Sequence, residues 1–142
     1  MKLQLISALM ATTLLSGCSP TEEKEVKMAC AVIMTDEEMS REVSLQSISA
    51  DDYCSCAAKT IVTMPEVDRA KAIPTILMVA QEMRENGGSA ELVFKDLRRA
   101  ADASDATPDA QAAYENMDAL GEQLEEILDD MASSNGQCSA KT

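Results

Sequence analysis

The chain has 142 residues, a length that suits one domain with a modest hydrophobic core, and a formal net charge of −13 at pH 7. A negative field of this size disfavours nucleic acid and anionic lipid headgroups as partners and favours cations or basic proteins. The sequence contains no histidine, which excludes histidine-based nucleophile systems and removes the most common metal ligand. With two tyrosines, one phenylalanine, few glycines and prolines, and abundant helix-forming residues, the composition predicts a helical protein.

The first 17 residues have the pattern of a secretory signal peptide, with one cation, Lys2, followed by an apolar run and then small residues. The run is shorter than the ~20 apolar residues that a permanent transmembrane helix needs. At its end the sequence Leu15-Ser16-Gly17-Cys18 resembles the lipobox of bacterial lipoproteins, in which a branched apolar residue, a small residue and Gly or Ala precede a cysteine. This resemblance implies cleavage before Cys18 and covalent lipid on Cys18, and the alternative is an ordinary secretory signal with a chance cysteine.

The resemblance also implies how the chain is divided. Residues 1–17 are expected to be removed, residues 18–24 to form a short lipidated tether, and residues 25–142 to form a single helical domain. Because two or more acyl chains anchor a protein stably, the mature protein is expected to be tethered to the membrane without spanning it. Ser19 stands where an aspartate would resemble an inner-membrane retention signal, which implies the outer membrane, facing the periplasm. No cofactor other than this lipid is expected.

Capping residues and apolar residues at three-four spacing predict helices along the rest of the chain. The longer helices are expected over 22–34, 50–63, 74–86, 90–103 and 108–133, with short segments after a Thr35 cap and over 66–73. Ser49, Ser89 and Thr107 are expected to start the helices over 50–63, 90–103 and 108–133. Pro74 is expected to separate two helices, because a proline inside a helix removes a hydrogen bond and clashes with the preceding turn. The expected fold is therefore all-α, a small antiparallel bundle of about five helices stapled by two disulfides.

The expectation of two disulfides comes from the four cysteines beyond Cys18, which are Cys30, Cys54, Cys56 and Cys138. An even number of cysteines in an oxidising compartment indicates disulfides. Residues i and i+2 of a helix point to different sides, so Cys54 and Cys56 are not expected to bond to each other. Each is expected to pair with Cys30 or Cys138, and the sequence leaves open which pairs with which. Cys138 follows the end of the last helix, and Cys54 and Cys56 lie near the start of the helix over 50–63. A bond between these two ends is expected to make the two helices run antiparallel.

The same Cys54-Ser55-Cys56 sequence has a second interpretation, as a thiol-redox or soft-metal site. Two thiolates with the thioether of Met64 or Met39 suit Cu(I). The simpler interpretation of the methionines is that they fill the core of a protein with few aromatic residues. We therefore expect no metal, and copper handling is the alternative.

The last predicted helix carries a cluster of like charges at i, i+3 and i+4 spacing, near the negative end of the helix dipole. The cluster consists of Glu122, Glu125, Glu126, Asp129 and Asp130. Each repulsive contact costs only a few tenths of a kcal/mol, so a solvated face tolerates the cluster. The alternative is a docking surface for a basic envelope protein, since local conflicts are enriched at functional sites.

These features together predict a membrane-anchored periplasmic binding, adaptor or assembly lipoprotein. We expect it to act through protein–protein contacts and not as an enzyme, because no catalytic motif accompanies the absence of histidine. No small-molecule substrate is evident from the sequence. A copper-handling or thiol-redox protein that uses Cys54 and Cys56 is the alternative function.

Overall fold

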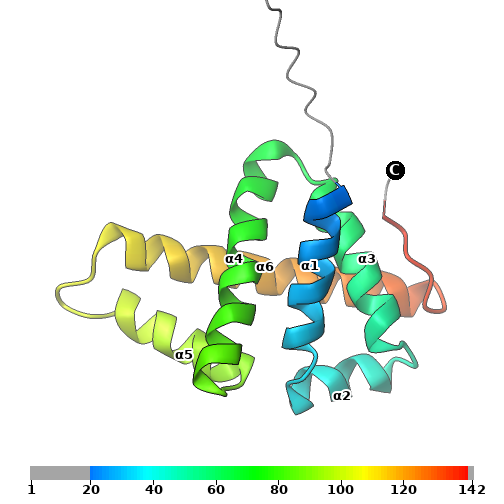
Figure 1. Cartoon of the computed structure of the whole chain (residues 1–142), viewed down its shortest axis with the longest axis horizontal. Helices are drawn as coiled ribbons and strands as arrows, with labels where there is room; N and C mark the ends of the chain where they lie inside the picture. Colours follow the sequence, from blue (N-terminus) through cyan, green and yellow to red (C-terminus); the bar gives the residue numbers. More distant parts are fainter. Residues whose placement is uncertain (1–19, 141–142) are drawn as a thin grey trace, which may run out of the picture.

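Six α-helices and no strand make up residues 20–140, the part of the chain that the computed structural model describes (Figure 1). The helices are α1 (Pro20–Ile33), α2 (Glu37–Leu45), α3 (Ala50–Val62), α4 (Glu66–Asn86), α5 (Ala90–Ala101) and α6 (Pro108–Ser133). The predicted all-α fold is confirmed. The signal peptide and the lipobox cysteine, Cys18, lie outside the described residues. Helix α1 already begins at Pro20, so most of the segment predicted as a tether is helical.

The helix starts follow local capping signals in the sequence. Ser49, Ser89 and Thr107 each accept a hydrogen bond from a backbone N–H in the first turn of α3, α5 and α6, as predicted. Helix α2 is capped by Asp36 and not by the expected Thr35. The reason is that one carboxylate oxygen of Asp36 caps α2 while the other accepts the backbone N–H of Ala90, at 3.1 Å, and so ties the start of α2 to the start of α5.

Helix α4 runs without a break through Pro74, so the predicted separation at this residue is wrong. Pro74 and Ala70, whose carbonyl loses its helical donor, are both exposed, so water can replace the missing bond. The next carbonyl, that of Lys71, accepts a hydrogen bond from the hydroxyl of Thr75 at 2.7 Å. The buried face of α4, with Ile76, packs against α1 and α6 and outweighs the local cost of the proline.

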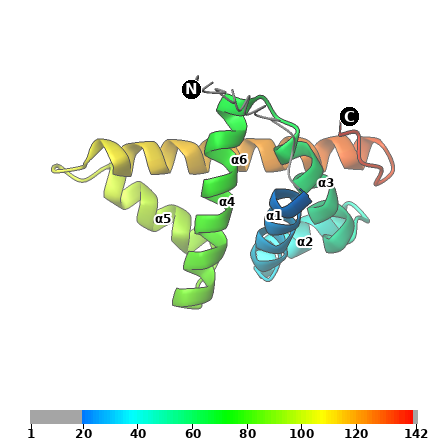
Figure 2. The ribbon, with the colours of Figure 1, turned by 45° about the horizontal axis from the view of Figure 1, so that its top comes forward.

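Helices α1 and α3 lie side by side in opposite directions, and α4 packs against the other side of α1. Helix α6 crosses α3 and α4, which Figure 2 shows from a second direction. The expected antiparallel alignment of α3 with α6 is therefore wrong. The chain after Ser133 turns back on itself, with the Gly136 N–H donating to the Met131 carbonyl, and this turn brings Cys138 to α3 without alignment of the two helices.

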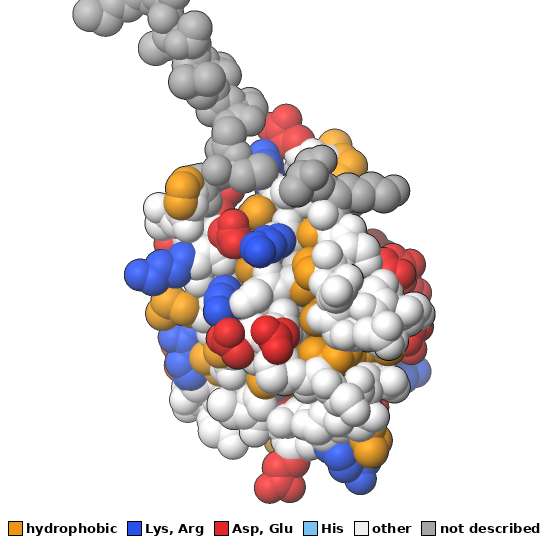
Figure 3. All heavy atoms as spheres, turned by 90° about the vertical axis from the view of Figure 1, so that its right-hand side faces the viewer, with side chains coloured by type: hydrophobic (Ala, Val, Ile, Leu, Met, Phe, Trp, Pro, Cys, Tyr) orange, Lys and Arg blue, Asp and Glu red, His pale blue; other side chains and the backbone are white. Residues whose placement is uncertain are grey.

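Two disulfides join these elements, as predicted. Cys30 is bonded to Cys54, which links α1 to α3, and Cys56 is bonded to Cys138, which links α3 to the tail after α6. The structure thus decides the pairing that the sequence leaves open. Cys30 and Cys54 are buried, whereas Cys138 is exposed. The face shown in Figure 3 carries acidic and basic side chains together. Among the described helices, none has both the length and the apolar character needed to cross a bilayer.

Candidate functional site

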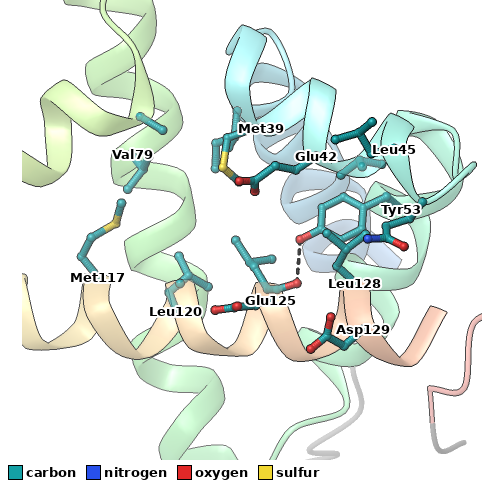
Figure 4. A pocket seen from close by; sticks show the side chains of 16 residues that line it. Met39, Glu42, Leu45, Tyr53, Val79, Met117, Leu120, Glu125, Leu128 and Asp129 are labelled. Atoms are coloured by element: carbon teal, nitrogen blue, oxygen red, sulfur yellow. Dashed lines mark hydrogen bonds between the residues drawn. The ribbon is translucent and has the colours of Figure 1, made fainter. Parts of the chain in front are cut away.

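A hollow of about 600 Å³ opens between α2 and α6 (Figure 4). Helix α3 closes its inner end, where Tyr53 lies, and Val79 of α4 lines its side. Met39 and Glu42 extend from α2 toward α6. The volume lies within the range of ~300–1,000 Å³ that is common for binding pockets, and most of the lining is apolar.

The inner end of the hollow is fixed by a long-range hydrogen bond. The hydroxyl of Tyr53 donates to the backbone carbonyl of Leu124 at 2.9 Å, which ties α3 to α6 directly below the opening. Burial raises the pKa of Tyr53 well above its ordinary value, and the nearby carboxylate of Glu42 raises it further. The phenol therefore keeps its proton at neutral pH and acts as a structural donor.

A second hollow, of about 380 Å³, continues from the first along α2 and α6 toward α5. We call the two hollows together the α2–α6 groove. Its floor consists of Met39, Tyr53, Met117, Leu120, Leu124 and Leu128. Its walls consist of Glu38 and Glu42 on α2 and of Asp118, Glu122, Glu125 and Asp129 on α6.

The walls of the groove are acidic on both sides. All six wall carboxylates belong to exposed residues, and none of the residues that line the two hollows is Lys or Arg. Within residues 20–140 no wall carboxylate forms an ion pair. Glu91, which also lines the second hollow, is paired with Lys95. Walls of one sign over an apolar floor concentrate the negative potential in the groove and attract cationic groups.

Gly121 lies on α6 in the middle of the groove and lines both hollows. A Cβ added at this position meets nothing within 4 Å, and no positive φ requires a glycine there. A glycine inside a helix destabilises it relative to alanine. Its effect at this position is to leave the floor open between the two walls.

The structure divides the five acidic residues that the sequence singles out. Glu122, Glu125 and Asp129 line the groove, while Glu126 and Asp130 are exposed on α6 outside it. Asp130 lines a separate, smaller hollow. The sequence analysis missed the opposite wall, since only the tertiary structure shows that α2 faces α6. It also missed Asp118 and Gly121. Their positions four residues before Glu122 and Glu125 indicate the same face of the helix, so this spacing was the signal for them.

The cysteines proposed as soft-metal ligands are in disulfides with different partners. Met64 lines a hollow beside Cys56, whereas Met39 lies in the α2–α6 groove. Among the described residues, no group of three His, Cys, Asp or Glu side chains is placed to hold a metal ion. Binding of Cu(I) by Cys54 and Cys56 as thiolates requires reduction of both disulfides.

No known protein family, characterised protein or solved structure matches this chain. The shape and the charge of the α2–α6 groove are therefore the evidence on its function.

Proposed function

We propose that the mature chain is a lipid-anchored protein of the outer membrane, facing the periplasm, which binds a basic envelope protein without catalysing a reaction. The lipobox resemblance at Cys18 supports the anchor. The two disulfides are consistent with an oxidising compartment. Six exposed carboxylates around an apolar floor, with no Lys or Arg among the lining residues, are the observation that carries the proposed partner.

Electrostatic complementarity explains why the partner is basic. A cationic surface that approaches the groove gains from all six wall carboxylates at once, whereas the faces with mixed charge offer attraction and repulsion together. The lipid supplies the membrane attachment, because the net charge of −13 repels anionic headgroups. The protein surface thus remains available for a partner in the periplasm.

The anchor is tested with Cys18→Ala in the full chain. We expect the wild-type protein to fractionate with the outer membrane and to carry acyl groups on Cys18 by mass spectrometry. Without the thiol the protein is expected to lose both properties. A wild-type chain with an unmodified Cys18 in the soluble fraction contradicts the anchor.

The partner is tested by affinity capture from an envelope extract with matched charge reversals. Glu122→Lys, Glu125→Lys and Asp129→Lys together reverse one wall of the groove, and we expect this variant to lose the captured basic protein. The control reverses three exposed residues of the same helix outside the groove, Glu115, Glu126 and Asp130. Equal capture by both variants contradicts the proposal, and so does capture that is insensitive to salt.

A further inference from the structure

We infer that the occupant of the α2–α6 groove is an amphipathic helix of the partner, with an apolar stripe on the floor and Lys or Arg side chains against both walls. This inference depends on the proposed function, because it names the part of the basic protein that enters the groove. The groove follows α6 from Met117 to Asp129, which at 1.5 Å per residue is about 18 Å. Three turns of a docked helix cover about this length.

The position of the charges favours a polycationic segment over a small amphiphile. A small molecule with one apolar chain and one cation satisfies a carboxylate at one end of a pocket. Here the carboxylates recur along α6 at Asp118, Glu122, Glu125 and Asp129, and Glu38 and Glu42 stand on the opposite wall. Several cations on either side of an apolar stripe match this pattern, and one helix presents them at i, i+3 and i+4 spacing.

Other peptide conformations fit the groove less well. An added β-strand needs a free sheet edge, and residues 20–140 contain no strand. A polyproline segment needs a groove lined with aromatic rings, whereas the two hollows contain only Tyr53 and Phe94. A second copy of this chain is disfavoured by its net charge of −13, which places like charges against the walls.

The floor has the adaptable character of helix-binding grooves. Met39 and Met117 are half-buried, and their flexible thioethers adjust to apolar side chains of different shape. Gly121 keeps the centre of the floor open, although alanine is the better helix former at this position. An open floor is what a side chain from a docked helix requires.

The experiment uses the lipidated full chain in nanodiscs of phosphatidylcholine, with empty nanodiscs as the blank. The probe is an 18-residue Leu/Lys peptide with acetylated and amidated ends, a fluorescent label, and leucines at helical i, i+3, i+4 and i+7 spacing. The control peptide has the same composition in an order that gives no apolar stripe. We expect the striped peptide to bind at least tenfold more tightly than the control and to gain helical circular dichroism on binding.

Three uncharged substitutions at Gly121 separate the effect of the shape of the groove from the effect of charge. Gly121→Leu places a side chain in the open floor and is expected to weaken binding of the striped peptide at least tenfold. Gly121→Ala adds only a Cβ, which meets nothing within 4 Å, and is expected to change binding less than threefold. Gly121→Gln, with a long uncharged side chain, is the second blocking variant, and helicity and thermal unfolding of the free variants confirm that each is folded.

The outcomes distinguish this inference from the proposed function. Equal binding of the two peptides overturns the inference, and so does unchanged binding of the striped peptide by both folded blocking variants. In either case, if reversal of Glu122, Glu125 and Asp129 still removes the captured basic protein, the proposed function stands with a different mode of contact. Capture that survives this reversal overturns the proposed function itself.

Discussion

Replacing Cys56 and Cys138 together by alanine removes the disulfide that ties the C-terminal tail to α3. The two residues are 82 positions apart, and in the chain-entropy treatment the bond stabilises the folded state by about 4.5 kcal/mol. The bond between Cys30 and Cys54 closes 24 positions and contributes about 3.5 kcal/mol by the same treatment. The longer loop thus makes the larger contribution.

Urea unfolding followed by circular dichroism measures this loss. With a slope of about 2 kcal/mol/M, the Cys56→Ala/Cys138→Ala variant is expected to unfold about 2 M earlier than the wild type. Reduction of the variant then breaks the remaining bond and is expected to lower the free energy of unfolding by about a further 3.5 kcal/mol. Because the total of about 8 kcal/mol is similar to the net stability of a small domain, the fully reduced wild type is expected to be unfolded.

A small loss of stability, either on removal of the Cys56–Cys138 bond or on full reduction, refutes this reasoning. A loss below about 1.5 kcal/mol for the Cys56→Ala/Cys138→Ala variant means that the tail does not restrict the unfolded chain as this pairing requires. A fully reduced wild type that keeps its helicity and unfolds cooperatively means that the apolar core is sufficient without the disulfides. Peptide mapping of the unreduced protein provides the control, since it is expected to recover the pairs Cys30–Cys54 and Cys56–Cys138.

Three single substitutions test other parts of the structure by thermal or urea unfolding. Gly121→Ala is expected to raise the free energy of unfolding by about 0.5–1 kcal/mol, because an open helical position gains a better helix former, and a loss of stability contradicts the open floor. Pro74→Ala is expected to raise it by at least about 1 kcal/mol because α4 is continuous, whereas no gain indicates a break at this residue. Tyr53→Phe is expected to lower it by about 1 kcal/mol at pH 7 through loss of the hydrogen bond to Leu124. Because the pKa of Tyr53 is raised, the protonated phenol stabilises the wild type fully below pH 10.0, the ordinary pKa of tyrosine. The difference in the free energy of unfolding between the wild type and Tyr53→Phe is therefore expected to shrink as the pH rises above 10.0. A difference that stays constant contradicts the buried phenol.

The features that sequence analysis predicted correctly are those determined by neighbouring residues. The caps Ser49, Ser89 and Thr107 act on N–H groups three residues further along the chain, so their role is visible without the fold. Pro74 misled the prediction because the packing of α4 against α1 and α6 outweighs a local penalty. The prediction of Thr35 as the cap of α2 failed for a similar reason. The actual cap, Asp36, also accepts the N–H of Ala90, which lies far along the chain.

The candidate site was predictable only in part, for the same reason. The acidic cluster on α6 was evident from its spacing, and three of its members line the groove. The opposite wall and the apolar floor depend on the position of α2, which the hydrogen bond from Ala90 to Asp36 and the packing of α2 against α3 determine. The disulfide pairing likewise depends on which helices become neighbours. Long-range geometry is what converts a charged helix face into a groove.

The central claim is that a basic protein occupies the α2–α6 groove in the periplasm, and photo-crosslinking in intact cells tests it most directly. A photoreactive analogue of methionine replaces Met117, whose side chain already lies in the floor, so that the groove stays open. In a matched chain the same amino acid is placed at position 126, which is exposed on α6 outside the groove. The account predicts a crosslink from position 117 to a basic protein, identified by mass spectrometry. The crosslink is expected to be lost when Glu122, Glu125 and Asp129 are reversed and to be absent from position 126. No crosslink at position 117, or the same products from both positions, contradicts the account.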